Sequence, residues 1–576
     1  MQAFLADLKR THYCGDLRAA HLGQDVVLLG WVHTRRDHGG CVFIDLRDRS
    51  GVVQVVFRPE TDAAAHKAAG ELRSEFCIGV SGRVVSRGTN VNPRLATGEV
   101  EIEGARLEIF SRSDPPPFAI EDKIDAGESL RLKHRYLDLR RPALQKNFLV
   151  RSEVYRIVRD TLRGHGFAEI ETPFMIRHTP GGARNFLVPS RLNPGSFYGL
   201  AESPQLFKQL FMVSGFDRYF QIVRCFRDED VRYDRQPEFT QIDLEMSFVV
   251  ETDVQAVVES LIAALWERIL GVRLDVPFPS MPYDEATGRY GSDKPDLRFD
   301  LPLCDVSPAM QTEGRAAKVL RIPAAHKLSR SQLDGLEDFA KPFGSKLGWA
   351  RVAEGGAWQG PFKRPDEERA AVERLCGAAA SDVLIFCLDR PAVVDTTLGA
   401  LRLHMGERFG LAQKDAWRFL WVTDFPLLEE TDHGWGARHH PFTSPRLEDL
   451  DLLESDPGRV RARAYDLVLN GSEIGGGSIR NHRPDVQTRL FSAIGIGEAE
   501  ARDKFSFLLD ALRFGPPPHG GIAFGLDRIV MLLCGAESIR DVIAFPKTQR
   551  GTCLMTDAPA PAAPGQLDEL HIRLKV

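Results

Sequence analysis

Hydrophobic and polar residues alternate without a break in the stretch QIDLEM, which follows a loop of mixed charges. The polar positions are Gln241, Asp243 and Glu245, and the apolar positions between them are Ile242, Leu244 and Met246. Side chains that alternate in this way lie on opposite faces of a β-strand. The stretch therefore predicts a half-buried strand whose polar face carries carboxylates.

Short runs of β-branched and aromatic residues occur throughout residues 1–112. They are separated by Gly, Asp and Asn, and they read DVVLLGWV, GCVFIDLRD, GVVQVVF and CIGVSGRVV. Several short strands joined by turns predict a small β-barrel. The segment SRSDPPPFAI follows, and its three consecutive prolines predict a hinge or a plain linker, because they continue neither a strand nor a helix.

A helical spacing of apolar residues replaces the alternation further along the chain. Over residues 148–167 one helix face would carry Val154, Ile157, Val158 and Leu162. A short strand, AEIETPFM, and a second helix, SPQLFKQLFMV, precede the charged loop. Residues 286–415 contain surface-like helices such as PDEERAAVERLC, which indicates an insertion, and strand-like runs resume from Trp417.

The composition excludes several classes of protein. At 576 residues the chain is too long for one hydrophobic core, and its 43% hydrophobic content is typical of globular proteins. No apolar run approaches a membrane span, and the first residues lack the basic-then-apolar order of a signal peptide. Nine cysteines occur singly, without a CxxC pair, which indicates reduced thiols in the cytoplasm. The net charge of −6 does not decide whether nucleic acid binds, because a local basic patch is what contacts phosphate.

Three groups of residues carry candidate chemistry, and the first lies at the charged loop. Arg227 begins this loop, and Glu229 follows two residues later. The arginine can bind phosphate through two parallel hydrogen bonds, and the carboxylate can accept from an exocyclic amine. Residues 230–236 are too charged to be buried, so they either reach over a polyanion or form a solvated hairpin tip.

The second group brackets a glycine-rich turn. Asp466 and Glu473 are seven residues apart, glycines 475–477 follow, and Arg480 comes next. Two carboxylates together with phosphate oxygens are a usual way to hold Mg²⁺. The glycines either let the backbone approach a ligand closely or form a β-bulge.

The third group is GIAFGLDRIVMLL, in which a glycine-rich strand turns into an apolar helix. Arg528 lies in the first turn of this helix, where its charge opposes the helix dipole. A bound anion at the helix end would offset that cost, and the alternative is an exposed arginine. His439 and His440 could bind a carboxylate or a metal, or belong to a core or loop; as neighbours in an extended segment they would be poor co-ligands.

Together these groups resemble the three signature motifs of the class II aminoacyl-tRNA synthetases. GFAEIETP resembles the first motif, FRDED with QPEFTQIDLEMSF resembles the second, and GIAFGLDR resembles the third. The barrel and the large insertion between the second and third motifs are similar to those of bacterial aspartyl-tRNA synthetases. The resemblance extends over essentially the whole chain, and the insertion is similar to that family's GAD domain.

This resemblance implies an α+β multidomain fold with an OB-fold barrel, an antiparallel-sheet catalytic domain and an inserted GAD-like α+β domain. The expected boundaries are an anticodon-binding barrel (1–112), a hinge (113–140), two catalytic segments (141–285 and 416–550), the insertion (286–415) and a C-terminal extension (551–576). It also implies a cytoplasmic homodimer that binds no membrane.

The implied reaction has two steps: L-aspartate and ATP form an aspartyl-adenylate, and the aspartyl group then passes to the 3′ end of tRNA. The aspartate pocket would comprise Gln205, Lys208, Arg227, Asp243, His439 and Arg480, with the loop at Gly181. ATP would contact Arg227, Asp228, Glu229, Gln236, Glu473, Gly525, Leu526, Asp527 and Arg528. Asp466 and Glu473 would hold Mg²⁺. Lys208 and Arg480 would select the charge of aspartate over asparagine.

The barrel stretch FIDLRDRSGVVQVVF is similar to the family's anticodon-binding surface. Phe43 would stack on an anticodon base and Gln54 would contact a base edge, as in other readers of single-stranded RNA. His38 and Thr89 stand where enzymes restricted to tRNA-Asp often carry leucine and lysine. They indicate the subgroup that charges both tRNA-Asp and tRNA-Asn and whose product a partner amidotransferase converts.

The sequence departs from the family pattern at one loop. The family usually reads TPEGARD, whereas this chain reads TPGGARN, with Gly181 and Asn185. The missing glutamate belongs to a mobile loop that closes over aspartate and its ammonium group. Glu202 stands where glutamine is common, and we expect it to supply a compensating negative charge.

Other interpretations remain open at the level of the sequence. An enzyme that charges tRNA-Asp alone would carry the same motifs. A catalytically inactive RNA-binding paralogue would have lost Arg227, Glu473 or Arg528, all of which are present. The insertion, together with the Lys208 and Arg480 pair, argues against a lysyl- or asparaginyl-tRNA synthetase.

Overall fold

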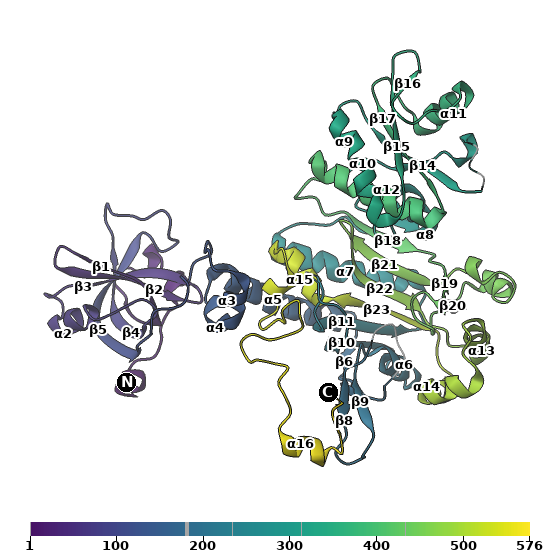
Figure 1. Ribbon diagram of the computed structural model, residues 1–576. Coiled ribbons are helices and arrows are strands. Elements are labelled where there is room, and N and C mark those ends of the chain that lie inside the picture. The colour runs from purple at the N-terminus through teal and green to yellow at the C-terminus, as the bar shows by residue number, and fades with distance from the viewer. Residues whose placement is uncertain are drawn as a thin grey trace. The chain divides into compact units, whose positions relative to one another are not determined.

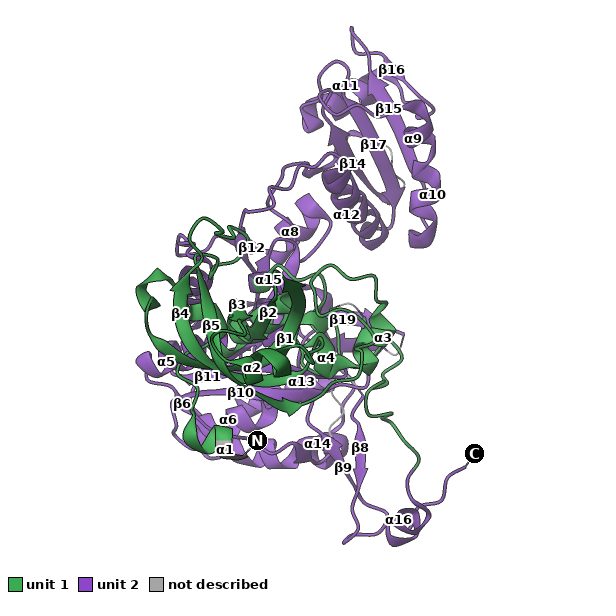
Figure 2. Cartoon of the chain, turned by 90° about the vertical axis from the view of Figure 1, so that its left-hand side faces the viewer, with its two compact units in different colours: residues 1–152, 231–236, 534–561 green, residues 153–230, 237–533, 562–576 purple. Residues whose placement is uncertain are grey.

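The computed structural model describes residues 2–178, 184–232, 234–310, 312, 314–432 and 434–575. The chain forms two compact units, shown in green and purple in Figure 2. The first unit contains residues 1–152, 231–236 and 534–561, and the second contains residues 153–230, 237–533 and 562–576.

A closed five-stranded barrel occupies the N-terminal part of the first unit, in the order β1-β2-β3-β5-β4 (Figure 1). Its strands are β1 (Asp25–His38), β2 (Cys41–Asp48), β3 (Gly51–Phe57), β4 (Cys77–Ser86) and β5 (Val100–Ser111). The fully buried barrel core includes Leu28, Ile44, Val55 and Val80. Apolar side chains at alternate strand positions fill this interior, which confirms the barrel expected from the sequence.

Short helices complete the first unit. They are α1 (Gln2–Asp7), α2 (Ala63–Ala69), α3 (Glu128–Lys133) and α4 (Arg135–Asp138), followed by the beginning of α5 (Pro142–Gly164). Residues 112–127, which include the three prolines, form neither helix nor strand. This is expected, because proline fixes φ and has no N–H to donate.

An eight-stranded sheet forms the centre of the second unit, in the order β12-β18-β21-β22-β23-β11-β10-β6. Its strands are β6 (Ala168–Glu169), β10 (Arg218–Phe226), β11 (Glu238–Ser247), β12 (Ser280–Pro282), β18 (Phe419–Thr423), β21 (Ala464–Leu469), β22 (Ser472–Ile479) and β23 (His519–Gly525). Neighbouring strands are antiparallel, except for the parallel pairs β6–β10 and β12–β18. On α5 the predicted apolar face is confirmed, because Val154, Ile157, Val158 and Leu162 have no exposed surface.

The charged loop joins β10 and β11, which pair from Arg218 opposite Met246 to Phe226 opposite Glu238. The expectation of a half-buried β11 is wrong, because residues 240–247 are all buried. Helix α6 (Gln205–Val213) contacts β11 and lies against its carboxylates. The polar side chains of this strand, Gln241, Asp243 and Glu245, are therefore buried inside the unit and do not face solvent.

A separate five-stranded sheet lies within the predicted insertion, in the order β13-β14-β17-β15-β16. Its strands are β13 (Leu303–Asp305), β14 (Ala316–Ile322), β15 (Leu347–Val352), β16 (Trp358–Gln359) and β17 (Val383–Asp389). Its helices are α9 (Arg330–Asp334), α10 (Leu336–Ala340), α11 (Asp366–Cys376) and α12 (Pro391–Arg408). Ile385 belongs to one apolar core and its neighbours Leu384 and Phe386 to another, so helices cover both faces of the sheet.

The remaining elements surround the eight-stranded sheet or extend from it. The helices are α7 (Glu251–Leu270), α8 (Tyr283–Tyr290), α13 (Pro484–Ala493), α14 (Glu498–Ala511), α15 (Leu526–Cys534) and α16 (Pro564–Glu569). The small sheets contain β7 (Met175–Ile176), β8 (Leu187–Pro189) and β9 (Phe197–Leu200), and β19 (Leu428–Thr431) with β20 (Gly434–Ala437). None of the described helices is both long enough and apolar enough to cross a membrane.

Candidate active site

Two carboxylates of β11 hold a buried lysine. Lys208, on α6, has no exposed surface, and its Nζ lies 2.8 Å from Asp243 Oδ1 and 3.1 Å from Glu245 Oε2. It also donates to the carbonyl of Leu244 at 3.3 Å. The period of two along β11 places both carboxylates on the same face, toward α6.

Arg480 follows β22 and adds a second cation to this group. Its Nε and Nη2 donate to the two oxygens of Glu245 at 2.9 and 3.1 Å, and its Nη1 donates to Ser478 Oγ at 2.6 Å. Glu245 thus lies between Lys208 and Arg480. Sequence reasoning placed Glu245 in the polar row but gave it no role, because its arginine partner is far away in the chain.

The two carboxylates differ in pKa because their partners differ. Burial raises the pKa of Asp243 to about 6, and the nearby charge of Lys208 only partly opposes this. Burial also acts to raise the pKa of Glu245, but the charges of Arg480 and Lys208 outweigh it and hold that pKa at about 2. Within the described chain, Asp243 Oδ2 is buried without a hydrogen-bond partner, so it can accept one from a ligand.

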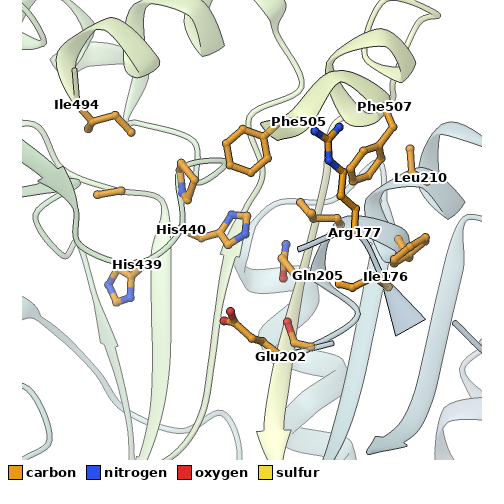
Figure 3. Close-up of a pocket in the computed structure, with 15 residues that line it drawn as sticks. Ile176, Arg177, Glu202, Gln205, Leu210, His439, His440, Ile494, Phe505 and Phe507 are labelled. Carbon is orange, nitrogen blue, oxygen red and sulfur yellow. The ribbon is translucent and has the colours of Figure 1, made fainter. Parts of the chain in front are cut away.

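A cavity of about 590 Å³ opens beside this group. It is lined by Ile176, Arg177, Glu202, Ser203, Gln205, Leu206, Phe207, Leu210, Ala437, His439, His440, Pro441, Ile494, Phe505 and Phe507. In the view of Figure 3, Phe505 and Phe507 lie at one end, Glu202 and Gln205 at the other, and His440 between them. Gln205 is one helical turn before Lys208, which connects the polar end of the cavity to the buried cations.

The polar end of the cavity offers both charge and hydrogen bonds. Gln205 Nε2 is buried and has no acceptor among the described residues, so it is a donor available to a ligand. Asn185 Nδ2 donates to Glu202 Oε1 at 3.3 Å and to the carbonyl of Leu200 at 3.1 Å. This amide orients the carboxylate that the sequence suggested as a compensating charge. Gly181 lies outside the described residues.

The two adjacent histidines have different surroundings. His440 Nδ1 accepts from the backbone N–H of Phe442 at 3.2 Å, and the ring of His439 packs edge-on against Phe425. Burial, with the charges of Arg480 and Lys208, lowers the pKa of His440 to about 3. Desolvation, with the charge of Arg438, lowers the pKa of His439 to about 4. Both rings are therefore neutral near neutral pH.

Arg227 lies directly after β10, at the start of the charged loop. Its guanidinium is 5.1 Å from the ring centroid of Phe239, and its backbone N–H donates to the carbonyl of Pro237 at 2.9 Å. Its Nε is buried without a partner in the described part of the chain, so the arginine has a donor for an anion. Asp228 donates its N–H to the carbonyl of Arg184 at 2.9 Å, and Glu229 comes next.

Asp466 and Glu473 face each other across the β21–β22 hairpin. A Cβ atom added at Gly476 would lie 2.7 Å from Asp466 Oδ1 and 3.4 Å from Glu473 Oε1, so both carboxylates lie over this glycine. Burial and the neighbouring Glu473 raise the pKa of Asp466 well above its usual value. Two crowded oxygen ligands fit Mg²⁺, which completes its shell with phosphate oxygens and water. The described residues contain no metal-binding group of three or more His, Cys, Asp or Glu.

The neighbouring glycines are required by the sheet itself. A Cβ at Gly475 would meet the ring of Phe524, and one at Gly477 would meet the carbonyl of Gly521. The register of this hairpin also shifts between Leu467 and Val468, as a β-bulge does. Close packing of neighbouring strands therefore explains two of the three glycines without a ligand.

The β23–α15 turn positions the last group. Arg528, in the first turn of α15, donates from Nη1 to the backbone carbonyl of Glu473. Asp527 is buried, and its Oδ2 accepts from the backbone N–H of Thr240 at 2.7 Å, which ties α15 to β11. Leu526 is fully buried, so its side chain is not available to a ligand.

Gln236 belongs to the first unit, where its amide is bound to one backbone segment. Its Nε2 donates to the carbonyl of Lys547 at 3.1 Å, and its Oε1 accepts from the Lys547 N–H at 2.7 Å. This pair of hydrogen bonds holds the end of the charged loop. A nucleotide contact from Gln236 would have to replace or share these bonds.

Comparisons with known proteins agree with this arrangement. The family profile of tRNA synthetases class II (D, K and N) matches residues 127–549, and the profile of the OB-fold nucleic acid binding domain matches residues 26–110. The chain belongs to the class II tRNA synthetases. It is 55% identical to the aspartate--tRNA(Asp/Asn) ligase of Anaeromyxobacter dehalogenans, over 100% of this chain and 99% of the relative. It is 52% identical to the ligase of the same name from Geotalea uraniireducens, with the same coverage.

Solved structures show the same fold at low identity. The aspartyl tRNA synthetase of Entamoeba histolytica has a TM-score of 0.61 at 19% identity, over 94% of this chain and 92% of that one. The asparaginyl-tRNA synthetase of Pyrococcus horikoshii, complexed with asparaginyl-adenylate, has a TM-score of 0.60 at 20% identity, over 94% and 99%. These matches confirm the predicted fold class of this class II synthetase.

The barrel of this class II synthetase carries a polar cluster around Gln54. Its Nε2 donates to Glu101 Oε2 at 2.8 Å, and its Oε1 accepts from Arg36 Nη2 at 3.3 Å. Phe43, on β2, is paired with Val56 of β3 and is only partly buried, so its ring retains exposed surface. Arg36 and Glu101 thus hold Gln54, through contacts that an alternating strand pattern does not predict.

His38 and Thr89 lie on loops or strand ends of the barrel. His38 ends β1 opposite Cys41, and the pair flanks a two-residue glycine turn. Thr89 is exposed in the turn between β4 and β5. Both side chains are exposed.

Proposed function

We propose that this class II synthetase activates L-aspartate with ATP and transfers the aspartyl group to tRNA-Asp and tRNA-Asn. The observation that carries the proposal is the buried group of Lys208, Asp243, Glu245 and Arg480 beside the cavity. It occurs in a chain that is 55% identical to an aspartate--tRNA(Asp/Asn) ligase over its full length.

Lys208 and Arg480 favour a substrate with a carboxylate side chain. Asparagine offers no negative charge to these cations, so we expect the site to prefer aspartate. The free oxygen of Asp243 and the carboxylate of Glu202 suit the ammonium group at the other end of the amino acid. The site therefore matches a small zwitterion that carries one additional carboxylate.

The first step needs no protein nucleophile. An oxygen of the aspartate α-carboxylate attacks the α-phosphorus of ATP, the bond to the β-phosphate oxygen breaks, and pyrophosphate leaves. Arg227 would donate to the α-phosphate through its Nε, which has no partner in the described chain, and Arg528, in the first turn of α15, would bind the γ-phosphate. Such a displacement depends on positioning and charge neutralisation.

Asp466 and Glu473 would hold the Mg²⁺ that accompanies ATP. When bound, the ion would supply positive charge to the phosphate groups. In the second step the terminal ribose hydroxyl of the tRNA attacks the aspartyl carbonyl carbon and AMP leaves. The proton of that hydroxyl passes to the phosphate oxygen of the departing AMP and neutralises the negative charge that this oxygen gains.

Recognition of two tRNAs is assigned to the barrel. Phe43 stacks on an anticodon base, Gln54 with Arg36 and Glu101 contacts base edges, and His38 and Thr89 tolerate a second anticodon. The test is aspartylation of tRNA-Asp and tRNA-Asn transcripts by the wild type and by His38→Leu. The proposal is supported if the wild type charges both tRNAs to a comparable extent and His38→Leu loses charging of tRNA-Asn. Charging of tRNA-Asp alone would mean a discriminating enzyme in which His38 is neutral.

A simpler assay tests the catalytic part alone. Aspartate-dependent exchange of radioactive pyrophosphate into ATP requires the adenylate step but no tRNA. An RNA-binding paralogue without catalysis would show no exchange, and this result would refute the proposed reaction.

Assembly and location follow from the same proposal. We assign the barrel, hinge, two-part catalytic domain and GAD-like insertion to the boundaries expected from the sequence, and we place the enzyme in the cytoplasm as a homodimer. Leu149, on α5, is 52% exposed and offers apolar surface to a second copy. Sedimentation analysis tests the dimer, and co-purification tests an association with an amidotransferase.

A further inference from the structure

A buried carboxylate of the barrel is held from within the barrel by an arginine. Glu75 lies just before β4 and is 3% exposed. Arg47, on β2, donates from Nη2 to both oxygens of Glu75 at 2.8 Å. Arg47 in turn has its Nη1 2.9 Å from His33 Nδ1 on β1. Glu75 is therefore fixed against two strands of the barrel.

The same carboxylate is also held from outside the barrel. Arg140, which follows α4, donates from Nη1 to Glu75 Oε2 at 2.7 Å. Its guanidinium lies over the Trp31 ring, 4.8 Å from the centroid. Both contacts join the barrel to the segment after the proline-rich linker. An arginine that combines a hydrogen bond with ring stacking fixes direction as well as distance.

The backbone of Glu75 is strained in a way that favours this arrangement. Its φ of 64° is in the left-handed region, and its N–H donates to the carbonyl of Val32 at 2.7 Å. A non-glycine residue rarely adopts this conformation, and it persists only when its surroundings hold it. In this conformation the carboxylate is bound by both Arg47 and Arg140.

The segment that carries Arg140 is itself anchored. Asp138 has no exposed side-chain surface and accepts from Arg135 at 2.6 Å and Arg141 at 2.9 Å. Arg135 donates onward to the carbonyls of residues 540, 543 and 544 at 2.7–3.1 Å. Residues 135–141 are thus fixed on one side to Glu75 and on the other to residues 540–544.

From this arrangement we infer that Glu75 and Arg140 are positioning residues for tRNA charging. They set the angle at which the barrel is held on residues 135–141, and so the direction in which a bound anticodon presents the rest of the tRNA. This inference rests on the proposed function. A rigid RNA converts a small rotation at the barrel into a larger displacement at its 3′ end. A misplacement of about 1 Å at a reacting group can cost roughly 100-fold in rate.

The test separates positioning from binding and from the adenylate step. Arg140→Met should lower kcat for tRNA aspartylation roughly 10- to 100-fold. Aspartate-dependent pyrophosphate exchange and affinity for an anticodon stem-loop should not change, since neither depends on the barrel angle. Arg140→Lys should recover only part of kcat, because lysine keeps the charge without the planar contact.

A second pair of variants checks that the two residues act through one contact. Glu75→Gln alone should reduce charging, and adding Arg140→Met should reduce it little further, because the contact is already lost. Arg112→Met is the matched control. Arg112 also pairs with a barrel glutamate, Glu71, at 3.2 Å, but the two side chains are 66% and 55% exposed. This control should charge tRNA like the wild type.

The outcomes distinguish the inference from the proposed function. If Arg140→Met charges tRNA like the wild type, the inference is overturned. It is also overturned if pyrophosphate exchange and tRNA charging fall equally, because that result indicates a merely structural role. If Arg140→Met fails to fold, the kcat values of Arg140→Lys and Glu75→Gln for tRNA aspartylation test the inference in the same way. Absence of exchange in the wild type refutes the proposed function instead.

Discussion

Asp243 Oδ1 accepts a hydrogen bond from Lys208 Nζ at 2.8 Å. The other carboxylate oxygen, Oδ2, is buried and has no hydrogen-bond partner in the described chain. A carboxylate with only one of its oxygens engaged is costly in a protein interior. It becomes favourable when a ligand brings its own donors. In the proposed reaction that donor is the ammonium group of aspartate.

The first prediction concerns the pH dependence of aspartate binding. Because the pKa of Asp243 is raised to about 6, its carboxylate gains a proton as the pH falls through that value. A proton on Oδ2 of Asp243 would prevent this oxygen from accepting a hydrogen bond from the ammonium group of the substrate, because both groups would then be donors. We therefore expect the KM for aspartate in pyrophosphate exchange to rise roughly tenfold per pH unit below about pH 6.

The neighbouring histidines do not account for such a profile. The pKa values of His440 and His439 are lowered to about 3 and about 4, so both rings stay neutral across this window. The KM for ATP, measured in the same series, is the internal control. A flat aspartate profile, or parallel changes for both substrates, would contradict the role of Asp243.

The second prediction concerns the paired hydrogen bonds between Arg480 and Glu245. Arg480→Lys keeps the positive charge but cannot match both carboxylate oxygens. We expect kcat/KM for aspartate to fall roughly 10- to 100-fold, the equivalent of losing a hydrogen bond between charged groups. The measurement is pyrophosphate exchange at varied aspartate.

Arg461→Lys is the matched control for this variant. Arg461 binds Asp449 through two hydrogen bonds of 2.8 and 2.9 Å, in the same unit but outside the residues that line the cavity. It should leave aspartate kinetics unchanged. Equal losses in both variants would show that any broken arginine pair has this effect.

Local patterns were enough to predict several elements of the fold. The spacing of Val154, Ile157, Val158 and Leu162 located the buried face of α5, and short alternating runs indicated the barrel. These predictions succeeded because the side-chain period of a helix or strand is a property of neighbouring residues. The family match from residue 127 to 549 then confirmed the fold class.

Long-range relationships were beyond the reach of those patterns. Alternation in β11 showed which residues share a face but not that α6 covers that face, so the strand was expected to be half exposed. Glu245 binds Arg480, 235 residues away, and Gln236 binds Lys547, 311 residues away. Only tertiary packing brings such residues together.

The third prediction tests the charge supplied by Glu202. Glu202→Gln should raise the KM for aspartate roughly tenfold with little change in kcat, because it removes an attraction present before and during the reaction. Adding Asn185→Asp should recover part of the loss. The two side chains are hydrogen-bonded at 3.3 Å, so the exchange returns one carboxylate to the same corner of the cavity.

An unchanged KM in Glu202→Gln would remove Glu202 from aspartate recognition. Failure of the double variant to recover is informative as well. Asn185 also donates to the carbonyl of Leu200 at 3.1 Å, and an aspartate there cannot. The recovery should therefore be incomplete, and its size measures how much of the effect is charge alone.

The fourth prediction concerns the carboxylate pair over Gly476. Burial and the charge of Glu473 raise the pKa of Asp466, so the two groups repel each other when no cation lies between them. Asp466→Asn replaces a carboxylate by a neutral amide. It therefore removes this repulsion and also removes one negative charge from the proposed metal site. We expect the metal-free protein to melt at a higher temperature than the wild type.

The same substitution should have the opposite effect on catalysis. The Mg²⁺ concentration that gives half-maximal pyrophosphate exchange should rise about tenfold or more, since a charged ligand becomes a neutral one. Melting in EDTA and exchange at varied Mg²⁺ measure the two effects separately. A lower melting temperature together with an unchanged Mg²⁺ requirement would mean that Asp466 supports the hairpin and does not hold the ion.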